Sequence, residues 1–150
     1  MGLDDRLLSS AAVNINRNKL FITGGYSYEG TLDTTEVHTF ESAPKVGKKM
    51  PFSTSDHCMV QFKYNQFMLI GYDKTMRRNR YFIYDLSTDQ WQPELRESVN
   101  GKLPKGGTTQ QFCTAFKTSG GKTKIFLSGY AFNSYLYDVS TKQWTKGKFS

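Results

Sequence analysis

The feature that most constrains this 150-residue chain is an internal duplication. Residues 82–91 and 135–144 are identical at six of ten positions and lie 53 residues apart. Upstream of each copy a short apolar run ends in glycine, at Gly71 and Gly129, and a third such run ends at Gly24. Self-similarity at this spacing is typical of repeat architectures, in which each unit packs on its neighbours. The sequence therefore predicts three copies of one structural unit.

Each unit has the pattern of four short strands separated by turn residues. A short segment precedes each glycine-ending run, at residues 11–15, 58–62 and 113–116. The duplicated segment supplies the third strand. We expect the fourth strand to begin at Trp91 in the second unit, at Trp144 in the third, and near Lys49 in the first. The predicted organisation is an N-terminal extension over residues 1–8 and a repeat region over 9–150, with repeats at about 9–52, 56–95 and 111–150.

This pattern resembles the Kelch repeat, in which a diglycine closes the second strand, a Tyr-Asp pair lies in the third and a Trp opens the fourth. The diglycine is kept at Gly24 and Gly25, whereas the Tyr-Asp pair and the Trp occur in the second and third units. In the first unit, Phe40 and Glu41 stand in place of the Tyr-Asp pair. The resemblance covers residues 9–150 and implies an all-β fold of antiparallel four-stranded Kelch blades, a partial β-propeller. We expect the two tryptophans to pack between blades, where large flat side chains bury much area.

Three blades are fewer than the roughly 4–8 with which propellers close. One explanation is that the chain is part of a longer propeller. Another is that it forms half of a six-bladed ring, as a homodimer closed by a second copy. An arc that stays open is the third.

The cysteine count favours a reducing, cytoplasmic setting. The chain has only Cys58 and Cys113, too few for the disulfide framework of small secreted domains, and it has no N-glycosylation sequon. We expect both as free, buried thiols at equivalent positions of the first strand in neighbouring blades, with a redox or nucleophilic role as the alternative. No apolar run is long enough for a membrane helix, so no membrane partner is expected.

Catalytic, metal-binding and cofactor-binding residues are not predicted. The only histidines are His38 and His57, and His57 is adjacent to a cysteine on a strand, where neighbouring side chains face opposite ways. No serine nucleophile elbow or carboxylate pair is evident. An alternative is a Kelch-type propeller enzyme similar to galactose oxidase, although its copper-ligand set is missing here.

The loops that connect the second strand to the third, and one blade to the next, leave the same side of an antiparallel blade. In the second unit these loops, residues 73–80 and 95–111, carry most of the chain's net charge of +7, whereas the loop over residues 26–33 is acidic. Loops on a rigid scaffold are where binding residues concentrate. The basic and aromatic residues predicted to bind a partner are Lys74, Arg77, Arg78, Arg80, Lys102, Lys105, Tyr26, Tyr28, Tyr72, Tyr130 and Phe132.

These observations favour a non-enzymatic protein–protein interaction module that recognises a protein or peptide, with acidic partners among the candidates. The Kelch resemblance implies such use, including substrate recognition within a ubiquitin-ligase adaptor. One alternative is that the charged loops are an ordinary solvated surface. Another is nucleic-acid binding, suggested by the pI of about 9.4 but disfavoured by the acidic sector that interrupts the basic one.

Overall fold

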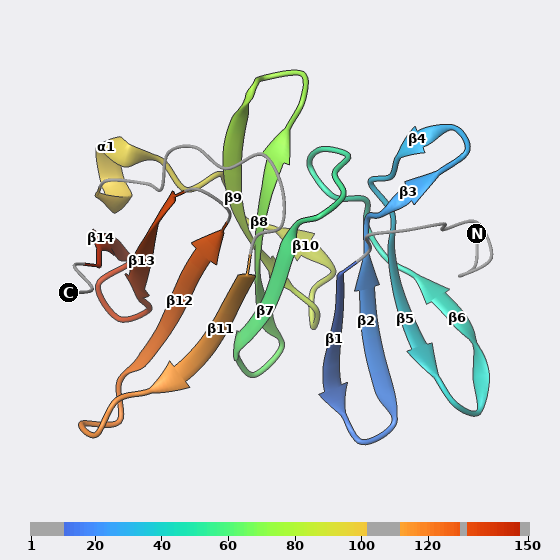
Figure 1. Cartoon of the computed structure of the whole chain (residues 1–150). Coiled ribbons are helices and arrows are strands. Elements are labelled where there is room, and N and C mark those ends of the chain that lie inside the picture. Colours follow the sequence, from blue (N-terminus) through green and yellow to red (C-terminus); the bar gives the residue numbers. More distant parts are fainter. Residues whose placement is uncertain (1–10, 102–111, 130–131, 148–150) are drawn as a thin grey trace.

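The computed structural model describes residues 11–101, 112–129 and 132–147 (Figure 1). Within these ranges the chain is all-β, an open partial propeller of three four-stranded antiparallel sheets and one two-stranded hairpin. We name the sheets blades one, two and three in chain order. The predicted fold class is confirmed, and closure of a ring by a second copy stays a prediction. No helix in the described ranges is long and apolar enough to cross a membrane.

Each blade is a meander in which consecutive strands are neighbours. Blade one contains β1 (Ala11–Asn16), β2 (Lys19–Thr23), β5 (Thr35–Thr39) and β6 (Ser42–Val46), and the hairpin β3 (Tyr26–Ser27) and β4 (Gly30–Thr31) interrupts it between β2 and β5. Blade two contains β7 (Cys58–Lys63), β8 (Gln66–Asp73), β9 (Arg78–Asp85) and β10 (Gln90–Trp91). The short helix α1 (Glu97–Asn100) precedes blade three, which contains β11 (Phe112–Lys117), β12 (Thr123–Gly129), β13 (Phe132–Asp138) and β14 (Gln143–Lys146).

The fourth strand of blade one lies earlier than predicted. It is β6, and Phe40 and Glu41 form the turn before it, with Phe40 84% exposed. This turn has two residues, whereas the corresponding turns of blades two and three have four. Aligning the three units by residue count alone therefore places the motif positions of blade one at the wrong residues. By strand register, His38 pairs with β2 as Tyr84 pairs with β8 and Tyr137 with β12. The position equivalent to the motif tyrosine in blade one is therefore His38.

Apolar side chains fill both seams between blades. Successive residues of a strand point to opposite faces of the sheet, so one set of side chains faces the preceding blade and the other set faces the following blade. At the seam of blades one and two, Phe21 stacks on Tyr84 with ring centroids 5.1 Å apart. At the seam of blades two and three, Trp144 is 3% exposed and packs 5.5 Å from Tyr81. Trp91 is half-buried at the first seam, 4.8 Å from Tyr84. The predicted packing of both tryptophans between blades is confirmed.

The two cysteines form a disulfide, which corrects the prediction of free thiols. The innermost strands β1, β7 and β11 lie side by side, with β7 in the middle (Figure 1). Cys58 of β7 and Cys113 of β11 are bonded across the seam with their Cα atoms 6.0 Å apart. The reducing, cytoplasmic setting favoured by the low cysteine count stays a prediction, and a disulfide is the less expected state in such a setting.

Strand register explains why the cysteines meet. Cys113 pairs with Leu127, whose counterpart in blade two is Leu69, and Leu69 pairs with Met59 rather than with Cys58. The cysteines are therefore one residue out of equivalence. Because neighbouring residues of a strand face opposite ways, Cys58 faces blade three and Cys113 faces blade two. At strictly equivalent positions both side chains would point the same way around the arc.

The two seams differ in how they satisfy their buried polar atoms. In blade two, the Tyr84 hydroxyl donates to Asp89, and the Trp91 indole N–H donates to the Lys48 carbonyl oxygen at 3.3 Å. In blade three, the Tyr137 hydroxyl and the Trp144 indole nitrogen are buried without a hydrogen-bond partner among the described residues. Burial raises the pKa of Tyr137 to about 12, which keeps the hydroxyl protonated as a donor.

Lys142 occupies the position in blade three that Asp89 occupies in blade two, and both residues have left-handed backbone, with φ of 58° and 52°. We predict that Lys142→Asp raises the free energy of unfolding by about 1 kcal/mol, because the new carboxylate can accept the Tyr137 hydroxyl. Lys142→Gly is the control, since it removes the cost of left-handed backbone at residue 142 without adding a carboxylate. Urea unfolding measures both variants, and an aspartate variant no more stable than the glycine variant contradicts the prediction.

Candidate functional site

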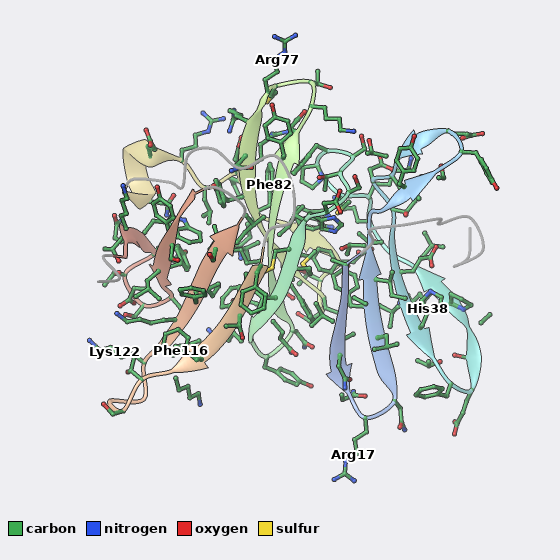
Figure 2. The ribbon with its side chains drawn as sticks, in the orientation of Figure 1. Arg17, His38, Arg77, Phe82, Phe116 and Lys122 are labelled. Atoms are coloured by element: carbon green, nitrogen blue, oxygen red, sulfur yellow. A yellow bond between two sulfur atoms is a disulfide. The ribbon has the colours of Figure 1, made fainter. Side chains whose placement is uncertain are left out.

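The loops divide onto two opposite ends of the blades. The hairpins β3–β4 and β8–β9 and the loop over residues 47–57 lie at one end, which we call the upper face (Figure 1). Figure 2 shows Arg77 at the tip of this face, and Arg17 and Lys122 at the opposite end. The predicted sorting of loops is therefore confirmed.

A small pocket opens on the upper face at the seam of blades one and two, and we call it the seam pocket. Its volume is about 80 Å³. Hydroxyl groups dominate its lining, together with one carboxylate and one ammonium group. The lining residues are Thr31, Ser53, Thr54, Ser55, Asp56, Tyr72 and Lys74. They come from the β3–β4 hairpin, the 47–57 loop and the β8–β9 hairpin, so the pocket exists only because two blades meet.

Gly24, which follows β2, and Gly71, near the end of β8, let the 47–57 loop approach both blades closely. Gly24 has φ +55°, and a Cβ there would lie 2.6 Å from the carbonyl oxygen of Thr54. The Gly25 N–H donates to that same oxygen at 3.0 Å. At Gly71 a Cβ would lie 3.1 Å from the side chains of Phe52 and Thr54. The repeated glycine therefore positions the floor of the seam pocket, a role that any larger residue would obstruct.

Exposed aromatic and basic side chains lie on the two hairpins that border the seam pocket. On the β3–β4 hairpin, Tyr28 is 92% exposed and Tyr26 is 42% exposed. On the β8–β9 hairpin, Lys74 and Arg77 are exposed beside Met76, which is 53% exposed. Large side chains left in water next to a polar pocket are typical of recognition surfaces.

Arg78 and Arg80, which the sequence also assigned to partner binding, are engaged within the fold. The Arg80 guanidinium donates to Asp73 and to Glu94, each at 3.1 Å. It lies over the rings of Phe52 and Phe82, 5.2 and 4.9 Å from their centroids, and its side chain is only 13% exposed. Cation–π contacts of this kind reinforce a partly desolvated guanidinium.

Arg78 shares the second carboxylate of this ion network, donating to Glu94 at 2.6 Å. Its side chain is 47% exposed, so one side of it stays accessible at the upper face. Glu94 is not among the predicted site residues, because it lies just outside the charged loop over residues 95–111. Strands β8 and β9 also extend further than predicted, which reduces the loop to residues 74–77.

Both carboxylates of the network stay ionised at neutral pH. Although burial favours the protonated form, hydrogen bonds from Arg78 and Arg80 hold the pKa of Glu94 below its ordinary value. The pKa of Asp73 is likewise lowered despite burial, by the Met76 backbone N–H, Arg80 and the Thr75 backbone N–H. The network therefore holds the β8–β9 hairpin in place by charge-assisted hydrogen bonds.

Of the predicted residues, Tyr72 and Lys74 line the seam pocket. Tyr26 and Tyr28 lie on the β3–β4 hairpin, and Arg77 lies at the tip of the β8–β9 hairpin. Three further predicted residues, Lys102, Lys105 and Tyr130, lie outside the described residues. Phe132 begins β13, and its side chain is not among those described.

The histidines have structural partners. Nε2 of His57 shares a 2.9 Å hydrogen bond with the Thr23 hydroxyl, and His38 Nε2 lies 2.7 Å from a Glu36 carboxylate oxygen. Among the described residues no group of three or more His, Cys, Asp or Glu side chains could hold a metal ion.

Comparison of the chain with protein-family models and with curated proteins finds no match. The fold and the geometry of the upper face are thus the basis for assigning a function.

Proposed function

We propose that the chain is a Kelch-type blade array that acts as a non-enzymatic protein-interaction module and binds a protein or peptide partner at the seam pocket. The observation that carries this proposal is the pocket's position between two hairpins that expose Tyr28, Lys74 and Arg77. The Kelch resemblance supports it and extends it to substrate recognition within a ubiquitin-ligase adaptor.

The chemistry of the pocket suits a polypeptide. The hydroxyls of Ser53, Ser55 and Thr31 can both donate and accept, so they can satisfy the peptide groups of a bound segment. Tyr28 offers a large, rigid ring at low entropic cost, as interface tyrosines commonly do. Lys74 and Arg77 lie outside the ion network and favour a partner with acidic side chains near the docked segment.

The test reverses charge at the rim of the pocket. Lys74→Glu with Arg77→Glu should leave the melting temperature nearly unchanged, because both side chains are exposed. Partners captured by the wild-type chain should be lost, and their binding to the wild type should weaken as salt is raised. Quantitative pull-downs followed by mass spectrometry measure the loss.

Arg17→Glu with Lys122→Glu is the matched control, since it makes the same change in net charge at the opposite end of the blades (Figure 2). This control variant should retain the partners. Equal recovery by the two double variants would remove the seam pocket from consideration. Recovery of nucleic acid in place of proteins would favour the nucleic-acid alternative.

A further inference from the structure

The disulfide Cys58–Cys113 is the covalent link between the innermost strands of blades two and three. It joins residues 55 positions apart, so it closes a segment that contains all of blade two and the connection to blade three. At the seam of blades one and two, by contrast, β1 and β7 lie side by side without cysteines in β1. The disulfide therefore links blades two and three, and no disulfide links blades one and two.

That seam also holds two buried polar atoms that have no hydrogen-bond partner among the described residues. These atoms are the Tyr137 hydroxyl and the Trp144 indole nitrogen, whose counterparts in Tyr84 and Trp91 are hydrogen-bonded at the other seam. A buried polar group that lacks a partner weakens packing relative to a satisfied one. The non-covalent contacts between blades two and three are therefore weaker than those of a seam whose buried polar atoms are all paired. The disulfide then contributes a larger share of what holds these two blades together.

We propose that the Cys58–Cys113 disulfide is a redox-controlled clamp, which a thiol reductant opens. Its oxidation state sets how tightly blade three is held to blade two. Cys58 is 8% exposed, whereas Cys113 is half-buried, so an incoming thiolate reaches the Cys113 sulfur first. This proposal does not rest on the seam pocket, which lies at the other seam.

The step is a thiol–disulfide exchange with a dithiol reductant. A reductant thiolate bonds to the Cys113 sulfur, the S–S bond breaks, and Cys58 leaves as a thiolate that takes up a proton. The second thiol of the reductant then attacks the mixed disulfide and releases Cys113 as a thiol. Two electrons pass to the protein, and the reductant becomes a disulfide. Oxidation by a small disulfide runs the same steps backwards and closes the clamp again.

The experiment follows the intact chain with and without dithiothreitol. Mass spectrometry of the purified protein should find both cysteines blocked to alkylation until reductant is added. Reduction should lower the melting temperature by about 10 °C, as expected for opening a cross-link of this span in a chain of this size. Amide hydrogen exchange should then accelerate in β11–β14 but not in β1–β6, because only the second seam loses its link.

A Cys58→Ser, Cys113→Ser double variant is the control, and its melting temperature should not respond to reductant. Should that variant fail to fold, exchange on the reduced wild-type chain under native conditions still reports the selectivity. Restored protection after treatment with oxidised glutathione would support a reversible clamp. Free thiols in the untreated protein, an unchanged melting temperature, or equal acceleration in all three blades would overturn the proposal.

Discussion

Trp144→Ala should lower the free energy of unfolding by about 3–5 kcal/mol, the cost of a large cavity in a packed core. Trp144 is 3% exposed and fills the seam between blades two and three, against Tyr81 at 5.5 Å and Tyr137 at 5.0 Å. A loss of this size is a large fraction of the stability of a typical domain. Denaturant unfolding followed by circular dichroism measures it.

Two further variants separate the energetic cost of the cavity from that of losing the indole N–H. Trp144→Phe should cost much less than the alanine variant, because the ring is mostly kept and the lost indole N–H donates to none of the described residues. Trp91→Ala should also cost less, since Trp91 is only half-buried. A Trp144→Ala variant as stable as the wild type would mean that blade three does not pack on blade two as described.

The fold was predictable because the repeated motif residues are those that the seams require. The glycines near the ends of β2 and β8 are dictated by the close approach of a loop, and the tryptophans by packing between blades, so both recur in the sequence. The disulfide was not predictable by the same route. The β11–β12 turn over residues 118–122 is longer than the β7–β8 turn over 64–65. Counting residues therefore could not show that Cys58 and Cys113 differ by one position in register.

The candidate site was predictable in part. Tyr26, Tyr28 and Tyr72 and the cations Lys74 and Arg77 lie on the predicted face, because loop composition and strand direction suffice to place them there. The burial of Arg80 was not evident, since it depends on Phe52, Phe82 and Glu94, which lie in separate segments of the chain. The hydroxyl-rich 47–57 loop was also missed, because serines and threonines in a connection indicate no chemistry until two hairpins enclose them.

Arg80→Ala should cost about 3–5 kcal/mol at neutral pH, because it leaves two buried carboxylates without their shared cation. The side chains of Asp73 and Glu94 are 8% and 6% exposed, and only the partly exposed Arg78 would remain beside Glu94. Arg77→Ala, four residues beyond Asp73 at the exposed tip, should change stability by less than about 0.5 kcal/mol. Replacing all three charges, with Arg80→Met, Asp73→Asn and Glu94→Gln, should recover most of the loss, since no buried charge is then left unpaired.

Acid pH distinguishes this electrostatic loss from a packing defect. The folded-state pKa values of Asp73 and Glu94 are lowered, so their contribution to stability is fully present above the ordinary carboxyl values of 3.8 and 4.5. That contribution disappears as the pH falls through the lowered folded values. In Arg80→Ala the carboxylates lose the cation that holds them ionised, so protonation relieves their repulsion. Urea unfolding at pH 7 and pH 3 should therefore show a smaller difference between variant and wild type in acid. A difference that is equal at the two pH values would assign the whole effect to the contacts of Arg80 with Phe52 and Phe82.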